Sequence, residues 1–457
     1  EARHCAGITI GKYHMLKQLR PVLSLLAGVS LLLLGSGLLN TLLAVRGSEE
    51  SFSDQAMGLI MSGYFVGFFV GTFLALPLIR RVGHIRTFAM CAAVGSVSVL
   101  LHDAFATPWA WGGLRVLTGT ALVILYTVIE SWLNATTPPQ NRGQVFAVYM
   151  VVNLGALAVS QQFMSLAPAS SYLLFALASV LVTLSLVPVT GTRFGPPEVQ
   201  QVKRLGIRFL WRIAPLAISA AFLSGLAMGA FWGMSALYAS RIGLPTSEVA
   251  TFVTSGIIGG ALLQYPVGRL SDRFDRRRVL AGIVGVAAVS ALLIIPASFA
   301  SVEFLYAAIA LYGGLAFAVY PVAVAHLIDH LESGDILPGG SALLLVHGIG
   351  AAIGPALSGQ LMSMTGASAL PVYFAAVQGT LFMVAVWKMH QRQKDETTGE
   401  PAQFVPMVRT TPTALEMHPD DSEQSPDLAP DVAHGTSGES DIHEESREPP
   451  PSQAAQS

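Results

Sequence analysis

Two ionisable side chains within one long apolar run mark a place where chemistry is possible. Arg115 lies in the segment LRVLTG, and Glu130 follows fifteen residues later. At about 100° per residue the two differ by only about 60° around a helix, so both can face one pathway. A charged group in hydrocarbon costs at least about 2.5 kcal/mol. We therefore expect Arg115 to act on a proton or a substrate, unless it extends to the outer headgroups.

His347 lies in another apolar run, and an imidazole that faces water titrates near neutral pH. It can carry protons, although a histidine within a helix can also serve only to pack. Other polar or aromatic side chains within apolar runs are expected either to line a pathway or to bridge helices, and they are Asn40, Tyr64, Asn153, Gln161, Gln162, Trp232, Gln264 and Gln378. The first apolar run contains no carboxylate, so proton coupling through an early acid has no support.

The composition is that of a membrane protein. Of the 457 residues, 52% are hydrophobic and 12% are charged, against about 25% charged in ordinary soluble proteins. Residues 395–457 hold 14 acidic and 2 basic side chains, which leaves 24 basic and 14 acidic ones, a net charge of +10, in the first 394. There is no P-loop, CxxC or HExxH motif. We therefore expect no enzyme activity, metal, cofactor or nucleic-acid partner, and a gradient or a partner must power any pumping.

Twelve apolar runs are long enough to cross a membrane, since about 20 apolar residues span about 30 Å of hydrocarbon. They cover residues 22–45, 56–79, 87–106, 109–133, 145–166, 171–190, 214–239, 248–268, 278–298, 302–328, 339–363 and 369–389. Arginine and lysine gather in alternate loops, and the opposite loops hold only Arg46 and Arg241. This asymmetry predicts a multi-pass protein of the bacterial inner membrane with both termini in the cytoplasm.

The runs divide the chain into two six-helix bundles, residues 22–190 and 214–389, joined by a cytoplasmic linker at 191–213. Residues 1–21 form a cytoplasmic N-terminus, and we expect translation to start at Met15. Residues 390–457 form an acidic tail, rich in Pro and Ser, that we expect to be disordered. A shift of 192 residues superposes Gly67 on Gly259 and aligns two basic loops. Two such repeats predict a cavity between them near the midplane.

The basic loop of the second half carries the most specific motif. Residues 268–278 read GRLSDRFDRRR, which resembles the loop signature of the major facilitator superfamily. The resemblance implies an all-α membrane fold of twelve transmembrane helices in two pseudo-symmetric six-helix bundles. It also implies that Gly268, Asp272, Arg273 and Arg277 form a latch at the cytoplasmic gate. The alternative is that these arginines only fix the topology.

The first-half copy of the motif departs from the family pattern. Arg80 stands where the family has Asp, and it is followed by Arg81 and Gly83. A latch on this side therefore needs another acid, and Glu130 is the expected partner of Arg80 or Arg81, unless it is solvated. In the second half Asp329 is the analogous partner for Arg273 or Arg277.

Other segments extend the resemblance. Arg115 to Gly119 is similar to the family's fourth-helix motif, whose arginine is implicated in proton transfer in some members. The eleventh run resembles the signature of facilitator antiporters. Close helix packing is expected at Gly119 of the fourth run and at Gly350, Gly354, Pro355 and Gly359 of the eleventh. That signature belongs in the fifth run, which weakens an antiporter assignment. Residues 130–132 and 320–326 are similar to the YcaD-like branch of bacterial facilitators.

These observations predict a secondary active transporter that moves a small molecule by alternating access with proton coupling. An anionic or neutral metabolite is favoured, because Arg115 is available and no carboxylate for a cation is obvious. One alternative is an efflux antiporter for amphipathic drugs. Another is a non-transporting membrane sensor or scaffold that acts through the acidic tail. The expected partners are the substrate, membrane lipid and protons, and the expected oligomeric state is a monomer.

Overall fold

The computed structural model describes residues 2–191 and 205–391, together with residues 404, 407 and 411 of the tail. Its α-helices are α1 (Ala2–Glu49), α2 (Asp54–Val82), α3 (His84–Ala104), α4 (Pro108–Thr136), α5 (Arg142–Gln162), α6 (Tyr172–Leu184), α7 (Leu186–Thr190), α8 (Ile207–Ile213), α9 (Pro215–Arg241), α10 (Thr246–Arg273), α11 (Arg276–Ala300), α12 (Val302–Ile328), α13 (Ile336–Thr365) and α14 (Ala369–His390). Three short 3-10 helices are η1 (Pro139–Asn141), η2 (Phe163–Leu166) and η3 (Ser333–Asp335). The described residues contain no β-strand.

Twelve segments of the described chain are long and apolar enough to cross a membrane, which confirms the predicted fold class. They agree with the predicted runs to within five residues at every end. Most of the linker, residues 192–204, lies outside the described residues. Most of the tail, for which disorder is expected, lies outside them as well. The last part of the linker forms the short helix α8.

Local sequence signals fix the helix ends near the predicted motif. Helix α2 ends at Gly83, whose φ of 84° is a conformation that favours glycine. The loop after α10 is only two residues long, and the side chain of Asp275 caps α11 by accepting the backbone N–H of Arg277 at 2.8 Å. The motif residues therefore lie at the facing ends of α10 and α11.

The internal repeat is visible in the helix packing. In the first half α2 crosses α4 so closely that a Cβ added at Gly67 would overlap the carbonyl of Val116. In the second half α10 crosses α12 in the same way, with Gly259 against the carbonyl of Ala310. The two glycines are those that a shift of 192 residues superposes, so the repeat preserves a close helix crossing in both halves.

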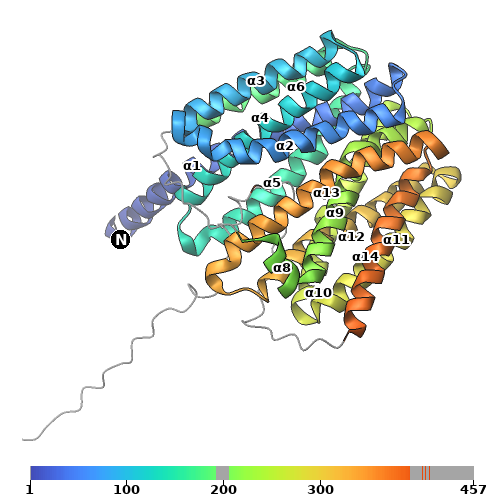
Figure 1. Ribbon diagram of the computed structural model, residues 1–457. Helices are drawn as coiled ribbons and strands as arrows, with labels where there is room; N and C mark the ends of the chain where they lie inside the picture. Colours follow the sequence, from blue (N-terminus) through green and yellow to red (C-terminus); the bar gives the residue numbers. More distant parts are fainter. Residues whose placement is uncertain (1, 192–204, 392–403, 405–406, 408–410, 412–457) are drawn as a thin grey trace, which may run out of the picture.

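The two halves form two groups of helices, coloured blue to teal and green to red in Figure 1. They meet along α2 with α13, α5 with α10, and α1 with α9. One face of the molecule carries Arg80, Arg81, Arg142, Arg273 and Arg277, and we call it the basic face. The other end of the spans carries Arg46, Asp54 and Arg241, and we call it the opposite face.

Candidate functional site: a central cavity with one closed end

A cavity of about 110 Å³ lies between the two halves. Its walls come from α2, α9, α12 and α13, and its described lining residues are Tyr64, Phe65, Phe68, Phe69, Thr72, Met228, Gly229, Trp232, Phe317, Tyr320, Leu344, Leu345, His347, Gly348, Ala351 and Met407. None of these lining residues is Asp, Glu, Lys or Arg. The cavity therefore offers aromatic faces, methionines and a few hydrogen-bonding groups rather than a charge.

The predicted residues Tyr64, Trp232 and His347 all lie on this wall. The ring of His347 is 4.5 Å from the ring of Tyr320, centroid to centroid, and its Nδ1 is 3.2 Å from the carbonyl oxygen of Ala221. The hydroxyl of Tyr320 is buried and has no hydrogen-bond partner among the described residues. Because a buried hydroxyl normally has a partner, Tyr320 is available to bond a molecule in the cavity. The sequence analysis did not predict Tyr320 as a cavity residue, although a tyrosine within an apolar run was a signal for one.

Arg115 lies behind this wall rather than on it. Its side chain is 2% exposed, its Nη2 donates to Oδ1 of Asn40 at 2.7 Å, and its Cζ lies 4.6 Å from the centre of the Tyr64 ring. Asn40 in turn donates its amide to the backbone carbonyl of Trp232 in the other half. Arg115 is therefore held by α1 and α2. Through the two hydrogen bonds of Asn40, Arg115 is linked to Trp232 in the second half.

The opposite face is closed by contacts between the halves. Nε of Arg241 lies 2.7 Å from Oδ1 of Asp54, and its Nη2 donates to the carbonyl of Phe52 at 2.6 Å. Below this ion pair, Ser62 Oγ accepts the backbone N–H of Ala356 at 3.0 Å. The sequence analysis had treated Arg241 only as an exception to the charge asymmetry. An arginine on loops otherwise poor in basic residues was the signal that it left unused.

Glycine contacts continue this closure. A Cβ on Gly359 of α13 would meet the carbonyl oxygen of Asp54, and one on Gly58 would meet the carbonyl oxygen of Pro355. Gly350 and Gly354 pack α13 against α9 in the same manner. The absence of side chains thus allows α2, α9 and α13 to approach closely where the two halves meet.

At the basic face the motif forms an ion-pair network, in which Asp329 has a partner that was not expected. Asp329 pairs with Arg276, whose Nε lies 2.9 Å from Oδ2, and Arg276 also approaches Asp272 at 3.9 Å. The expected partners had been Arg273 or Arg277. Arg276 takes the place because it begins α11 and points inward, with 7% of its surface exposed, whereas Arg273 is exposed at the end of α10.

The expected pairing of Glu130 with Arg80 or Arg81 is wrong. Glu130 is fully buried, and its Oε1 accepts the hydroxyl of Tyr149 at 2.7 Å. Its Oε2 accepts the backbone N–H of Thr411 at 3.1 Å, and the Thr411 hydroxyl donates to it as well. Arg80 and Arg81 are exposed at the end of α2 and have no ion pair within the described part of the chain. Helix α4 turns Glu130 toward α5 and the tail, away from the arginines.

The other predicted polar residues hold helices together or lie away from the cavity. Gln161 accepts the hydroxyl of Thr41, and Gln162 donates to Thr254 across the two halves at 3.1 Å. Asn153 donates to the carbonyl of Tyr149, one turn earlier in α5. Gln264 and Gln378 are buried in the second half and do not line the central cavity. Within the described residues no three His, Cys, Asp or Glu side chains gather as metal ligands would.

The chain matches a family of membrane transporters along most of its length. The family model described as Major Facilitator Superfamily matches residues 25–258 and 217–417. An uncharacterized MFS-type transporter YcaD of Escherichia fergusonii is 28% identical over 366 residues, which cover 78% of this chain and 93% of that protein. An uncharacterized MFS-type transporter of Enterobacter sp. (strain 638), Ent638_1421, is 29% identical over 368 residues with the same coverage.

Solved structures share the fold at low sequence identity. The nucleoside transporter NupG superposes with a TM-score of 0.66 and 15% identity, covering 82% of this chain and 100% of that chain. A bacterial homologue of the human lysosomal transporter Spinster, in an inward-facing and occupied conformation, gives a TM-score of 0.67 and 17% identity, with 83% and 98% coverage. The transporter FucP in its outward conformation gives 0.53 and 17% identity, with 80% and 98% coverage.

Proposed function

The chain belongs to the Major Facilitator Superfamily, and from that premise we propose that it is a secondary active transporter that works by alternating access. The observation that carries the proposal is the central cavity between two halves whose opposite face is closed by Asp54 and Arg241. A rocking motion that separates this ion pair and brings the basic ends together would expose the cavity to the other side. The state described above is then the inward-facing one.

The orientation follows from the charges on the loops. The basic face carries nearly all the loop arginines, and such loops stay in the cytoplasm during membrane insertion. We place this face in the cytoplasm of a bacterial inner membrane, with both termini on the same side. The end of the cavity on the side of the basic face is then the cytoplasmic end.

The cavity lining favours an uncharged or amphipathic solute with an aromatic or apolar body. None of the described lining residues is Asp, Glu, Lys or Arg, and Arg115 is already bound to Asn40 behind the Tyr64 ring. An anion would have to give up its water without a free cation in exchange. The neutral substrate expected from the sequence is therefore favoured over the anionic one, and an aromatic solute would stack on Trp232 or Phe317.

Efflux of amphipathic compounds is a second candidate, because Met228 and the aromatic side chains can adapt to solutes of different shapes. In both cases His347 supports proton coupling, since its imidazole lies on the cavity wall, where it can accept a proton from water that enters the cavity. The described lining residues include no carboxylate that could carry a proton instead.

Proteoliposomes that contain a pH dye test this proposal. Nucleosides and other neutral aromatic solutes, organic anions, and lipophilic cations are added as separate panels to the folded protein. A response to neutral or amphipathic solutes that changes the internal pH is expected, and its sign separates symport from antiport. A response to organic anions alone would overturn the substrate class. No flux with any panel, either in the full-length protein or in a folded variant without residues 396–457, would overturn the transporter proposal.

The variant His347→Gln separates coupling from transport. It retains hydrogen-bonding atoms but cannot titrate, so solute uptake should persist while the accompanying pH change is lost. Ser341→Ala serves as a matched control, because Ser341 is on the same helix but does not line the cavity. A pH change of wild-type size in the His347→Gln variant would show that protons take another path.

A further inference from the structure

Three residues of the tail return to the folded body at the basic face. The first, Phe404, donates its backbone N–H to Oδ1 of Asp272 at 3.0 Å. Its ring covers Gly268, where an added Cβ would collide with the ring carbons. The glycine and the aspartate of the GRLSDRFDRRR motif thus provide a flat surface and a hydrogen-bond acceptor for the tail.

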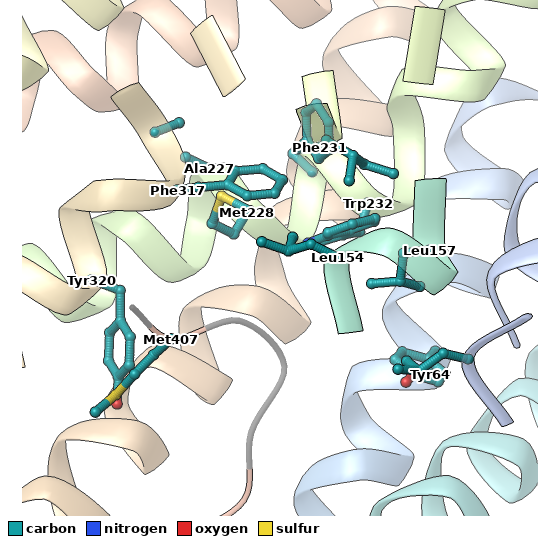
Figure 2. Packing of buried hydrophobic residues seen from close by; sticks show 14 of the residues in the cluster. Tyr64, Leu154, Leu157, Ala227, Met228, Phe231, Trp232, Phe317, Tyr320 and Met407 are labelled. Atoms are coloured by element: carbon teal, nitrogen blue, oxygen red, sulfur yellow. The ribbon is translucent and has the colours of Figure 1, made fainter. Parts of the chain in front are cut away.

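The second residue, Met407, enters the central cavity. It is 5% exposed and lines the cavity together with Tyr320 and His347 of the second half and Tyr64 of the first half. Figure 2 shows its thioether beside the hydroxyl end of Tyr320, with Tyr64 farther away on a helix of the other half. An apolar, flexible side chain suits this uncharged lining, and its burial favours the docked position.

The third residue, Thr411, is fully buried against the first half. Its backbone N–H and its hydroxyl both donate to the Glu130 carboxylate, which also receives the hydroxyl of Tyr149. A buried carboxylate requires such donors, because without them its desolvation is costly. Thr411 thereby contributes two hydrogen bonds to a carboxylate that the membrane-spanning helices bury.

We propose that the tail acts as a plug through Phe404, Met407 and Thr411, which dock at the cytoplasmic end of the cavity and hold the transporter in its inward-facing state. The proposal rests on the proposed function, because it uses the same cavity and the same orientation. The plug contacts Asp272 in the second half, the cavity wall in the middle, and Glu130 in the first half.

The consequence of this position is mechanical. Alternating access requires the basic ends of the two halves to approach each other, and a segment wedged between Asp272 and Glu130 prevents that approach. Met407 also takes up space in the cavity that a solute would fill. The tail therefore inhibits transport in cis, and its release permits the transport cycle. Inhibition needs only a few contacts because the segment is tethered at a high effective concentration.

Thiol labelling at the cavity wall tests the plug without knowledge of the substrate. The cavity residue is marked by Leu345→Cys in a background that carries Cys5→Ser and Cys91→Ser, and a membrane-impermeant reagent is applied to inside-out vesicles. Truncation after residue 395 should accelerate labelling about tenfold, the gain expected from losing about 1.4 kcal/mol of docking free energy. Adding the peptide AQFVPMVRTTPT, residues 402–413, should restore the slow rate, whereas a scrambled peptide should not.

Point variants in the full-length chain provide a second test that leaves the helices intact. Met407→Asp brings a charge into an apolar cavity and should accelerate labelling, whereas Met407→Leu preserves volume and polarity and should not. Thr411→Val removes the hydroxyl that Glu130 accepts, whereas Thr411→Ser keeps it. In each pair the first variant should behave like the truncated protein and the second like the wild type.

The outcomes separate the plug from the proposed function. Equal labelling rates in the full-length and truncated proteins, or equal effects of both peptides, would overturn the plug and leave the transporter proposal in place. Absence of labelling from the basic face in the truncated protein would instead contradict the inward-facing cavity itself. Flux that falls upon truncation of a folded protein, rather than rising, would also overturn the inhibitory role.

Discussion

At the scale of single residues, the site depends on which buried polar groups are already bonded and which are not. The Tyr149 hydroxyl donates to a buried carboxylate, whereas the Tyr320 hydroxyl faces the cavity without a partner among the described residues. Both tyrosines are buried, so burial alone does not distinguish a structural group from one available to a ligand. The presence or absence of a hydrogen-bond partner distinguishes the two hydroxyls.

This difference predicts opposite effects of the same substitution. Tyr149→Phe removes a bond to a charged acceptor and should lower the unfolding free energy by about 1.5 to 3 kcal/mol. Tyr320→Phe removes no internal bond, so stability should change by less than about 0.5 kcal/mol, while the affinity for the transported solute falls. Melting in detergent and solute binding measure the two effects. If the Tyr320→Phe protein were destabilised and its affinity for the solute unchanged, the hydroxyl would have a structural role and no role in solute binding.

Arg115 allows a second prediction at this scale. Arg115→Lys keeps the charge but loses the planar guanidinium that lies over Tyr64 and donates to Asn40. We expect solute flux to fall about tenfold or more. Arg86→Lys, on an exposed arginine of α3, should leave flux unchanged. Wild-type flux in the Arg115→Lys variant would contradict this prediction, because it would show that only the positive charge at this position matters and not the shape of the guanidinium.

Residue pairings were the least predictable part of the site. The sequence placed Arg115, Tyr64, Trp232 and His347 in or beside the cavity, because polar and aromatic groups within apolar runs are few. It did not identify Asp54 and Arg241, or the selection of Arg276 by Asp329. Which of several neighbouring arginines points inward depends on where a helix begins, and helix ends are predictable only to within a few residues.

At the scale of elements, apolar length was sufficient to predict all twelve spans, because the hydrocarbon core sets the length that a helix needs. Close helix crossings were predictable in part, since glycine within an apolar helix marks a place where backbones can approach. Gly119 illustrates this, because it was expected from the motif RVLTG and lies against the backbone of Tyr64.

This crossing gives a prediction with a control on the same helix. A Cβ at Gly119 would overlap the carbonyl oxygen of Tyr64, so Gly119→Ala should force α2 and α4 apart and lower stability by about 1 to 3 kcal/mol. Gly113→Ala, where an added Cβ meets nothing within 4 Å, should cause no loss. Thermal melting in detergent compares the two. Equal melting temperatures would show that the crossing tolerates a methyl group.

At the scale of the whole molecule, the repeat and the charge asymmetry predicted two halves with a cavity between them. Neither signal indicates which end of the cavity is closed, because both states of an alternating-access protein share one sequence and one set of helices. The contacts of the tail with the helical body were equally unpredictable from the sequence. An acidic segment rich in Pro and Ser predicts disorder on average, and three separate contacts at Phe404, Met407 and Thr411 do not alter that composition.

The most direct test of alternating access is the side from which the cavity can be reached. Leu345→Cys, in the background without other cysteines, is exposed to an impermeant thiol reagent in inside-out and in right-side-out vesicles. We expect faster labelling from the cytoplasmic side. From the outside, labelling should be slow and should rise at least about threefold when Arg241→Ala breaks the ion pair with Asp54. Equal labelling rates from the two sides would contradict a cavity that is closed at the opposite face. A labelling rate from the outside that Arg241→Ala leaves unchanged would contradict it as well.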